Sequence, residues 1–462
     1  MYAPATTEKK YLKWYQKLAY GSGDLASNCS YGLVSSFVLL YLTGTLGLDS
    51  AIIGSLMLAS KVLDGISDVI FGTLIDRTHS KLGKARPWML FGQVGVSLCL
   101  FLLFAIPAGS TTMQYIYFFI VYTALNAVFY TANGIAYSSL VALITKNNNE
   151  RVQLGSFRFM FAVVTNIFMG FAVTGMVEKF GSGAAGWRTT ALIFAIVGLV
   201  VNTISCLAVK ELPEEELSGN TSEAAEEGKA VAEEKKHGFA ETAKILVHNK
   251  YYLMILAIYI VYYIMSNLTT GAGVFCATYY WGDGSLLGQF SMMKMFPVII
   301  ALAIAPVLIK KTGSMQKVNF WGYAISSVLG IPMIYFAMQK NLSMFLLFMF
   351  IKGIFAGTLS GSLNALIAEA SGYTTRTTGI HMDGMMYSCS SLGVKVGGGI
   401  GTAAVGWLLK LGGFVGTATV QSESAIRMIF NLYITFPFVI GIIITVLLAF
   451  LDVEKANKKW DA

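Results

Sequence analysis

Residues 61–77 read KVLDGISDVIFGTLIDR, which places a lysine and two aspartates inside an otherwise apolar run. Asp64 and Asp68 are four positions apart, so in a helix they project from nearly the same face, about 6 Å apart along the axis. An ionisable side chain at the centre of a bilayer costs on the order of 2.5–3.5 kcal/mol on insertion scales. We therefore expect this face to point into a helix bundle or a wet cavity.

The composition around this stretch is typical of a membrane protein. Of the 462 residues, 55% are hydrophobic and only 13% are charged, and the mean hydropathy is +0.63. Apolar runs long enough to cross a hydrocarbon core roughly 30 Å thick lie near residues 18–44, 50–75, 86–108, 113–143, 153–178, 187–209, 251–280, 284–309, 317–338, 341–371, 379–411 and 425–451. These twelve runs predict an all-α integral membrane protein, embedded as a multi-pass protein in the cell (plasma or inner) membrane.

The basic residues predict the orientation of these helices. If the connections alternate between two sides, one side receives most of the basic residues, among them Lys9, Lys10, Lys13, Lys17, Arg77, Lys81, Lys84, Arg86, Lys146, Arg151, Lys310, Lys311, Lys317, Arg376, Lys455, Lys458 and Lys459. Cytoplasmic loops carry an excess of lysine and arginine. Both termini are therefore expected on the cytoplasmic side.

One long polar segment, residues 210–250, divides the predicted helices into two groups of six. It is rich in Glu, Ala, Lys, Ser and Gly, which is the composition of a partly disordered or amphipathic linker. We expect a six-helix bundle over 1–209, the linker, a second six-helix bundle over 251–451 and a cytoplasmic tail over 452–462. Two bundles that rock about a central site are the layout of a secondary transporter.

The paired aspartates favour a bound cation or proton. Two carboxylates held together repel each other unless a positive charge lies between them, and small hard cations prefer oxygen ligands. The alternative is a buried ion pair that only locks helices together, with Lys61 partly neutralising Asp64. Of the other charges in apolar runs, Lys294 and Lys352 are expected to join helices or to snorkel, and Asp24 to cap a helix.

Other classes of function find little support. The five cysteines lack metal-ligand or paired spacing, and no nucleophile and base stand at a useful spacing, so neither an enzyme nor a cofactor is expected. The net charge of +8 falls in short loops, which is explained by topology and does not indicate nucleic-acid binding. Stretches dense in small residues, such as 353–365 and 394–406, indicate either close helix packing or hinges.

The loop after residue 71 contains Gly-x-x-x-Asp-Arg, formed by Gly72, Asp76 and Arg77. It resembles the loop between the second and third helices of the major facilitator superfamily. In that superfamily the loop makes a conformational latch, so the resemblance implies a gating loop here and the major facilitator fold.

Five motifs in order along the chain narrow this resemblance: YGSGD (20–24), KVLDxxxDxxxG (61–72), GKxRPW (83–88), RVQLxSxR (151–158) and GVKVGG (393–398). Together they resemble the glycoside-pentoside-hexuronide:cation symporters. The resemblance implies that Asp64 and Asp68, with Ser67 and Thr131, form the site for Na⁺ or H⁺. Sodium would then be held by the two carboxylates. It also implies that Lys395 connects the cation and substrate regions.

The substrate half of that pattern differs here. The positions of two sugar-binding aspartates hold Asn28 and Gly134, with Asn133 as the nearest polar residue, whereas the arginine is kept as Arg158. Tyr137 is an aromatic residue near this set. With the acidic ligands replaced and Arg158 and Lys395 retained, an anionic substrate such as a hexuronide or glucuronide becomes plausible. The sequence thus predicts a symporter, acting as a monomer, for a small sugar or glycoside; the alternative is a cation-coupled transporter of a lipid-like or steroid-like amphiphile.

Overall fold

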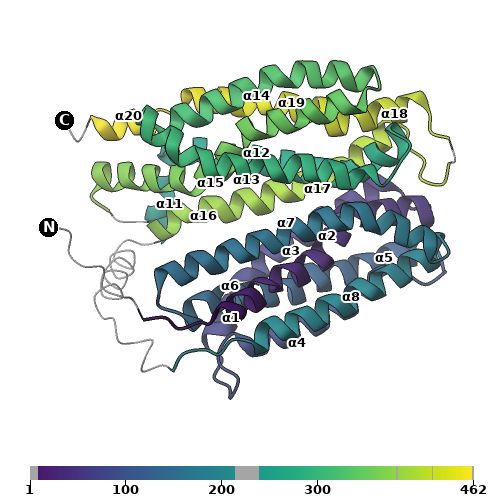
Figure 1. Ribbon diagram of the computed structural model, residues 1–462, viewed down its shortest axis with the longest axis horizontal. Coiled ribbons are helices and arrows are strands. Elements are labelled where there is room, and N and C mark those ends of the chain that lie inside the picture. The colour runs from purple at the N-terminus through teal and green to yellow at the C-terminus, as the bar shows by residue number, and fades with distance from the viewer. Residues whose placement is uncertain (1–8, 214–238, 381–382, 419, 460–462) are drawn as a thin grey trace. The chain divides into compact units, whose positions relative to one another are not determined.

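The computed structural model describes residues 9–213, 239–380, 383–418 and 420–459, and within them every regular element is a helix (Figure 1). In this described part of the chain, eleven helices are long and apolar enough to cross a membrane. The prediction of an all-helical membrane protein is confirmed. The chain forms two compact units, an N-terminal unit of residues 1–49 and 55–220 and a C-terminal unit of residues 50–54 and 221–462.

The N-terminal unit is built around α2, which packs against both α7 and α8, while α4 packs against α6 and α8. Its elements are α1 (Trp14–Gly21), α2 (Gly23–Leu40), η1 (Tyr41–Thr45), α3 (Ser50–Asp76) apart from its first five residues, α4 (Arg86–Leu103), α5 (Thr111–Thr123), η2 (Ala124–Tyr130), α6 (Thr131–Ile144), α7 (Asn148–Lys179) and α8 (Gly183–Leu207). The label η marks a π-helical segment.

In the C-terminal unit, α15 packs against both α13 and α14, and α12 packs against η4, α17 and α19. Its elements are α11 (Phe239–His248), α12 (Lys250–Phe275), η3 (Cys276–Tyr280), α13 (Leu286–Thr312), α14 (Met315–Met338), α15 (Leu342–Thr378), α16 (Asp383–Leu392), η4 (Gly393–Gly397), α17 (Gly398–Leu411), α18 (Glu423–Phe430), η5 (Asn431–Thr435), α19 (Phe436–Phe450) and α20 (Val453–Lys458).

Helix starts follow from residues that satisfy the unpaired backbone N–H groups of a first turn. Six helices of the described chain begin after a side chain that accepts such a bond, namely Ser110, Asn147, Asn249, Ser314, Asn341 and Ser422. Prolines inside α13 and α14 leave both helices continuous. Neighbouring helices and local adjustment compensate for such breaks in membrane proteins.

Most of the predicted boundary between the bundles lies outside the described residues, because 214–238 are not part of them. The division at 210–250 therefore stays a prediction. At its start, Glu211 is ordered, since its carboxylate accepts hydrogen bonds from the backbone N–H groups of Lys84, Ala85 and Arg86 at 2.7, 2.9 and 3.1 Å. Glu211 thereby caps α4, which sequence reasoning missed.

Small residues on α15 allow it to lie close to α13. A Cβ added at Gly353 would stand 2.8 Å from Pro297 Cβ, and one added at Gly357 would stand 2.7 Å from Ala301 Cβ. Real Cβ atoms do not approach so closely without a shift of the helices. At these positions the glycines serve packing, which was one of the two interpretations of the 353–365 stretch.

Candidate functional site

The first polar cluster forms where α3 meets the start of α6, inside the N-terminal unit. Thr131 Oγ1 lies 2.6 Å from Asp64 Oδ1, and Lys61 Nζ lies 3.6 Å from Asp64 Oδ2. The side chain of Asp64 is 13% exposed and that of Lys61 17% exposed. Each carboxylate oxygen of Asp64 therefore has a polar neighbour of its own, a hydroxyl on one side and an ammonium group on the other.

Thr131 has two acceptors within reach. Its hydroxyl lies 2.6 Å from Asp64 Oδ1 and 2.9 Å from the carbonyl oxygen of Asn126. A hydroxyl carries one proton and two lone pairs. When the proton points to Asn126, the lone pairs face the side on which the Asp64 carboxylate lies. Thr131 can then act as a neutral oxygen ligand for a cation held by that carboxylate.

A π-helical segment supplies this arrangement. The segment η2 ends at Tyr130, directly before Thr131, and includes Asn126. Such segments are rare and occur frequently at functional sites, because the extra residue in the turn displaces carbonyl groups and rotates the residues that follow. A regular helix with 3.6 residues per turn therefore predicts the wrong face for residues that follow such a turn. The sequence carries no signal for the π-helical segment.

The other two members of the predicted cation set lie on the same helix. Ser67 donates its hydroxyl proton to the backbone carbonyl of Asp64 at 2.9 Å, so it braces α3. Asp68 follows Asp64 by one turn and is partly buried. Among the described residues, no group of three or more His, Cys, Asp or Glu side chains is arranged to hold a metal ion. The oxygen set at α3 and α6 is therefore two carboxylates and hydroxyl groups.

A second cluster joins α2, α6 and α7. Arg158 Nε donates to Asp24 Oδ2 at 2.5 Å, and the guanidinium lies over the ring of Tyr137, 4.2 Å from its centroid. Tyr137 donates its own hydroxyl proton to the carbonyl of Tyr20 at 2.8 Å. The expectation that Asp24 caps a helix is wrong: α2 has Ser22 at its N-cap and no side-chain cap bond, and Asp24 pairs with Arg158 because an unpaired guanidinium is costly there.

The two predicted asparagines have different surroundings. Asn28 Nδ2 donates to the carbonyl of Asp24 at 2.7 Å, and Asn28 Oδ1 accepts from Asn166 Nδ2 at 2.9 Å, which makes Asn28 part of the Asp24–Arg158 cluster. Asn133 is buried and donates to Gln93 Oε1 of α4 at 2.6 Å. Sequence reasoning missed Asn166 and Gln93, although a lone amide in an apolar run is a usable signal.

The remaining predicted residues are on other segments of the chain. Lys395 belongs to the C-terminal unit, within the π-helical segment η4. Gly72 has open space where a Cβ would be, and Asp76 and Arg77 are exposed at the end of α3. Behind them the loop is fixed by Trp88, whose Nε1 donates to Thr78 Oγ1 at 2.7 Å.

Side chains of α2 and η2 connect the two clusters. Lys61 Nζ lies 5.8 Å from the ring centroid of Tyr31, which stacks on Tyr130 with ring centroids 5.5 Å apart. Tyr31 follows Asn28 by three positions on α2, and Tyr130 directly precedes Thr131. The charged group of α3 is therefore in contact with the helices that carry the Asp24–Arg158 cluster.

Residues 19–455 match the family described as MFS/sugar transport protein. The chain belongs to this family. Members with a similar sequence over most of their length include the isoprimeverose transporter of Lactiplantibacillus pentosus, 26% identical over 98% of this chain and 91% of the relative. The glucuronide carrier protein homolog of Escherichia coli K12 is 23% identical over 87% of this chain and 85% of the relative.

Solved structures agree on the fold. The crystal structure of a D-xylose-proton symporter has a TM-score of 0.64 and 12% identity, and the match covers 96% of this chain and 98% of that one. At that identity the likeness shows the fold alone. The MFS/sugar transport protein family consists of membrane transporters, so the chain is a transporter and not an enzyme, and the resemblance found in its motifs is confirmed.

Proposed function

We propose that this protein is a secondary active symporter that couples the inward movement of Na⁺ or H⁺ to the uptake of a sugar or glycoside. The observation that carries the proposal is the contact of Asp64 with Thr131, together with Asp68 one turn away. It brings carboxylate and hydroxyl oxygens from two helices to one place, which is what a small hard cation or a shared proton requires.

The membrane arrangement follows from the same proposal. The helix α3 has 27 residues, enough to cross a bilayer, and with the eleven other spanning helices of the described chain it would make twelve. With an even number of crossings both termini lie on the same side, and the basic loops assign that side to the cytoplasm. The protein acts as a monomer in this proposal.

Coupling arises when two ligands favour the same conformation. A cation at Asp64 removes the repulsion between the carboxylates of α3, and substrate at the Asp24–Arg158 cluster orders α2, α6 and α7. Because Tyr31 and Tyr130 join these regions, each ligand changes the stability of the arrangement that the other binds. Such a coupling free energy is reciprocal and typically about 1–3 kcal/mol.

The substrate site is proposed around Asp24, Asn28 and Arg158. Together they offer a carboxylate, an amide and a guanidinium, which can accept from and donate to sugar hydroxyls. The ring of Tyr137 packs against the guanidinium group of Arg158 and so positions it. The relatives are named an isoprimeverose transporter and a homolog of a glucuronide carrier protein, which suggests a glycoside of that size as the first substrate to test.

The test is uptake by the purified protein in liposomes with Na⁺ and H⁺ gradients imposed separately. Labelled isoprimeverose and a panel of neutral glycosides and glucuronides serve as probes. We expect uptake to rise with one of the two gradients, and Asp64→Asn and Asp68→Asn each to abolish that rise. The matched control is Glu178→Gln, which removes an exposed carboxylate of the same unit. Uptake that is equally fast without either gradient contradicts the coupling.

A further inference from the structure

A cavity of about 190 Å³ lies inside the C-terminal unit, with walls from α12, α13, α14, α15 and α19 and from Tyr433 of η5. Its lining is mostly apolar, with methionine and aromatic side chains, and it includes the hydroxyl groups of Tyr262, Ser266, Thr269 and Ser360. Drug-sized ligands occupy roughly 300–1,000 Å³. The cavity therefore suits one ring-sized group and not a long amphiphile.

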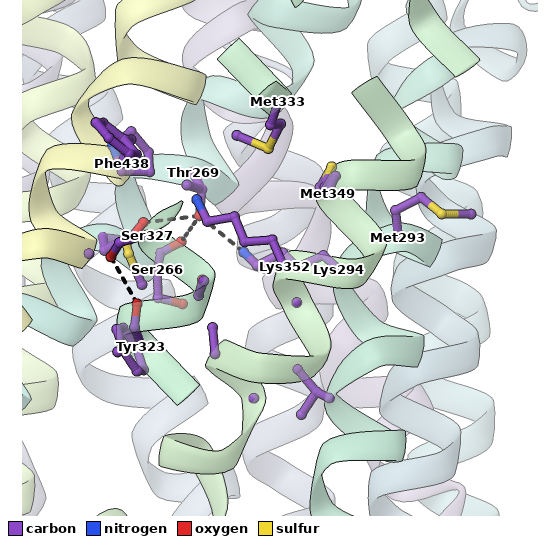
Figure 2. Close-up of a pocket in the computed structure, with 18 of the residues that line it drawn as sticks. Ser266, Thr269, Met293, Lys294, Tyr323, Ser327, Met333, Met349, Lys352 and Phe438 are labelled. Atoms are coloured by element: carbon purple, nitrogen blue, oxygen red, sulfur yellow. Dashed lines mark hydrogen bonds between the residues drawn. The ribbon is translucent and has the colours of Figure 1, made fainter. Parts of the chain in front are cut away.

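Two lysines face this cavity. Lys294 Nζ donates to Thr269 Oγ1 at 3.1 Å and to Thr270 Oγ1 at 3.2 Å, whereas Lys352 has neither a hydrogen bond nor an ion pair with any residue that the structure describes. Figure 2 shows both side chains extending toward Thr269. None of the described residues that line the cavity is acidic. Of the two predicted roles, joining helices is confirmed for Lys294, which bonds to α12, whereas Lys352 makes no such bond within the described residues.

Helix packing brings α13 and α15, which carry these two lysines, close together. Pro297 of α13 follows Lys294 by three positions, and Gly353 of α15 directly follows Lys352. Because a Cβ at Gly353 would stand 2.8 Å from Pro297 Cβ, the two helices are in close contact beside the lysines. The backbones that carry the two lysines are therefore held side by side, and both side chains line the same cavity.

Two ammonium groups in an apolar cavity are unfavourable without an opposite charge. Removing an ion from water costs several kcal/mol unless a partner and hydrogen bonds compensate for it. An anion that contacts both lysines would remove this cost, and the hydroxyls of Ser266 and Ser360 would bind its remaining polar atoms. The structure thus has the donors for a carboxylate and lacks, among its described lining residues, any acceptor with a negative charge.

We propose that this cavity binds the carboxylate of a transported, sugar-sized organic anion through Lys294 and Lys352. The inference rests on the proposed transport function and assigns to the C-terminal unit, by itself, a site for the charged group of such a substrate. Tyr262 and Tyr323 are among the aromatic side chains that line the cavity and would pack against the ring that bears the carboxylate.

The experiment compares two single-ring ligands that differ only at the sixth carbon, methyl β-D-glucuronide and methyl β-D-glucoside. Binding to the full-length protein in nanodiscs is measured by calorimetry at constant Na⁺ and pH. We expect the glucuronide to bind at least about tenfold more tightly, because its carboxylate forms charge-assisted hydrogen bonds that the neutral hydroxyl group of the glucoside cannot form. Lys352→Gln should abolish this preference and Lys352→Arg should keep part of it.

The matched control is Lys317→Gln, which removes an exposed positive charge at the start of α14 in the same unit. It should leave the preference unchanged. Thermal unfolding of each variant shows whether it is folded, and Lys352→Arg provides a second variant if Lys352→Gln is not. The inference is overturned if the wild-type protein shows no preference for the glucuronide or if Lys352→Gln retains that preference. It is also overturned if Lys352→Gln weakens the binding of both ligands equally.

Two further comparisons distinguish a substrate site from a general anion site, and a failure of the site from a failure of the coupling. If sodium acetate displaces the glucuronide as effectively as sodium glucuronate does, the cavity binds a small anion independent of the sugar, and the assignment to the substrate is wrong. Equilibrium binding needs no gradient. A failure of the Asp64→Asn uptake test therefore contradicts the coupling and leaves the carboxylate site standing, whereas an unchanged glucuronide preference in Lys352→Gln contradicts only the site.

Discussion

Arg158 Nε and Asp24 Oδ2 lie 2.5 Å apart in the N-terminal unit, and their side chains are 25% and 18% exposed. The arginine is therefore neutralised by a carboxylate of this chain. Arg158 therefore does not by itself favour an anionic substrate. Asp24 offers the negative charge that the replaced aspartates no longer supply. Lys352 in the other unit is the better candidate for that role.

This ion pair predicts unequal effects of single and double substitutions. Asp24→Asn and Arg158→Gln each leave one charge without its partner, so each should lower the free energy of unfolding by about 1–3 kcal/mol, less than for a fully buried pair. The double variant Asp24→Asn/Arg158→Gln should recover most of the lost free energy of unfolding, but it should still fail to bind glycoside. Thermal unfolding and binding of the four proteins form the double-mutant cycle. Additive losses would show that the pair is not coupled.

The hydroxyl of Thr131 should set the affinity for the coupling cation. Thr131→Ala removes a ligand or hydrogen-bond donor of Asp64, so the cation concentration for half-maximal uptake should rise about tenfold. Thr131→Ser keeps the hydroxyl and should stay within about threefold of wild type. Uptake is measured at increasing Na⁺ and, separately, at decreasing external pH. Equal cation dependence in all three proteins would exclude Thr131 from the site.

Glycine-to-alanine substitutions on α15 should change stability in opposite directions. At Gly357 the new Cβ would stand 2.7 Å from Ala301 Cβ, so Gly357→Ala should cost about 1–3 kcal/mol through overpacking. Gly372 lies on the same helix with nothing within 4 Å of an added Cβ, and Gly372→Ala should gain up to about 1 kcal/mol from helix propensity. Thermal unfolding midpoints in one detergent provide the comparison, and a Gly357→Ala variant as stable as wild type would contradict the packing role.

The two candidate asparagines should separate binding from stability. Asn133→Ala leaves the buried amide of Gln93 without its partner, which should lower the free energy of unfolding by about 1–3 kcal/mol and change glycoside affinity by less than about twofold. Asn28→Ala should weaken glycoside binding about tenfold with little effect on the free energy of unfolding, since Asn28 lies in the Asp24–Arg158 cluster. Calorimetry and thermal unfolding measure the two quantities. The reverse outcome would place the substrate at Asn133.

The sequence was sufficient to predict the helices. Long apolar runs form helices in a bilayer because backbone polar groups there must bond within their own segment, and the predicted run 251–280 matches Lys250–Tyr280 closely. The cost of charge in such a run also predicts that Asp64 is a site residue. Both inferences depend only on local composition.

What the sequence could not supply is which polar groups meet. Asp24 and Arg158 are 134 positions apart, and a π-helical segment changes the face on which Thr131 and Tyr137 lie, so neither contact follows from periodicity. The sequence by itself determined the helical membrane fold and the helix that holds the acidic pair. Only the tertiary structure decided that Arg158 is neutralised, that Thr131 reaches Asp64, and that Lys352 faces a cavity with no acidic side chain among its described lining residues. Those outcomes depend on packing between helices that are distant in the sequence.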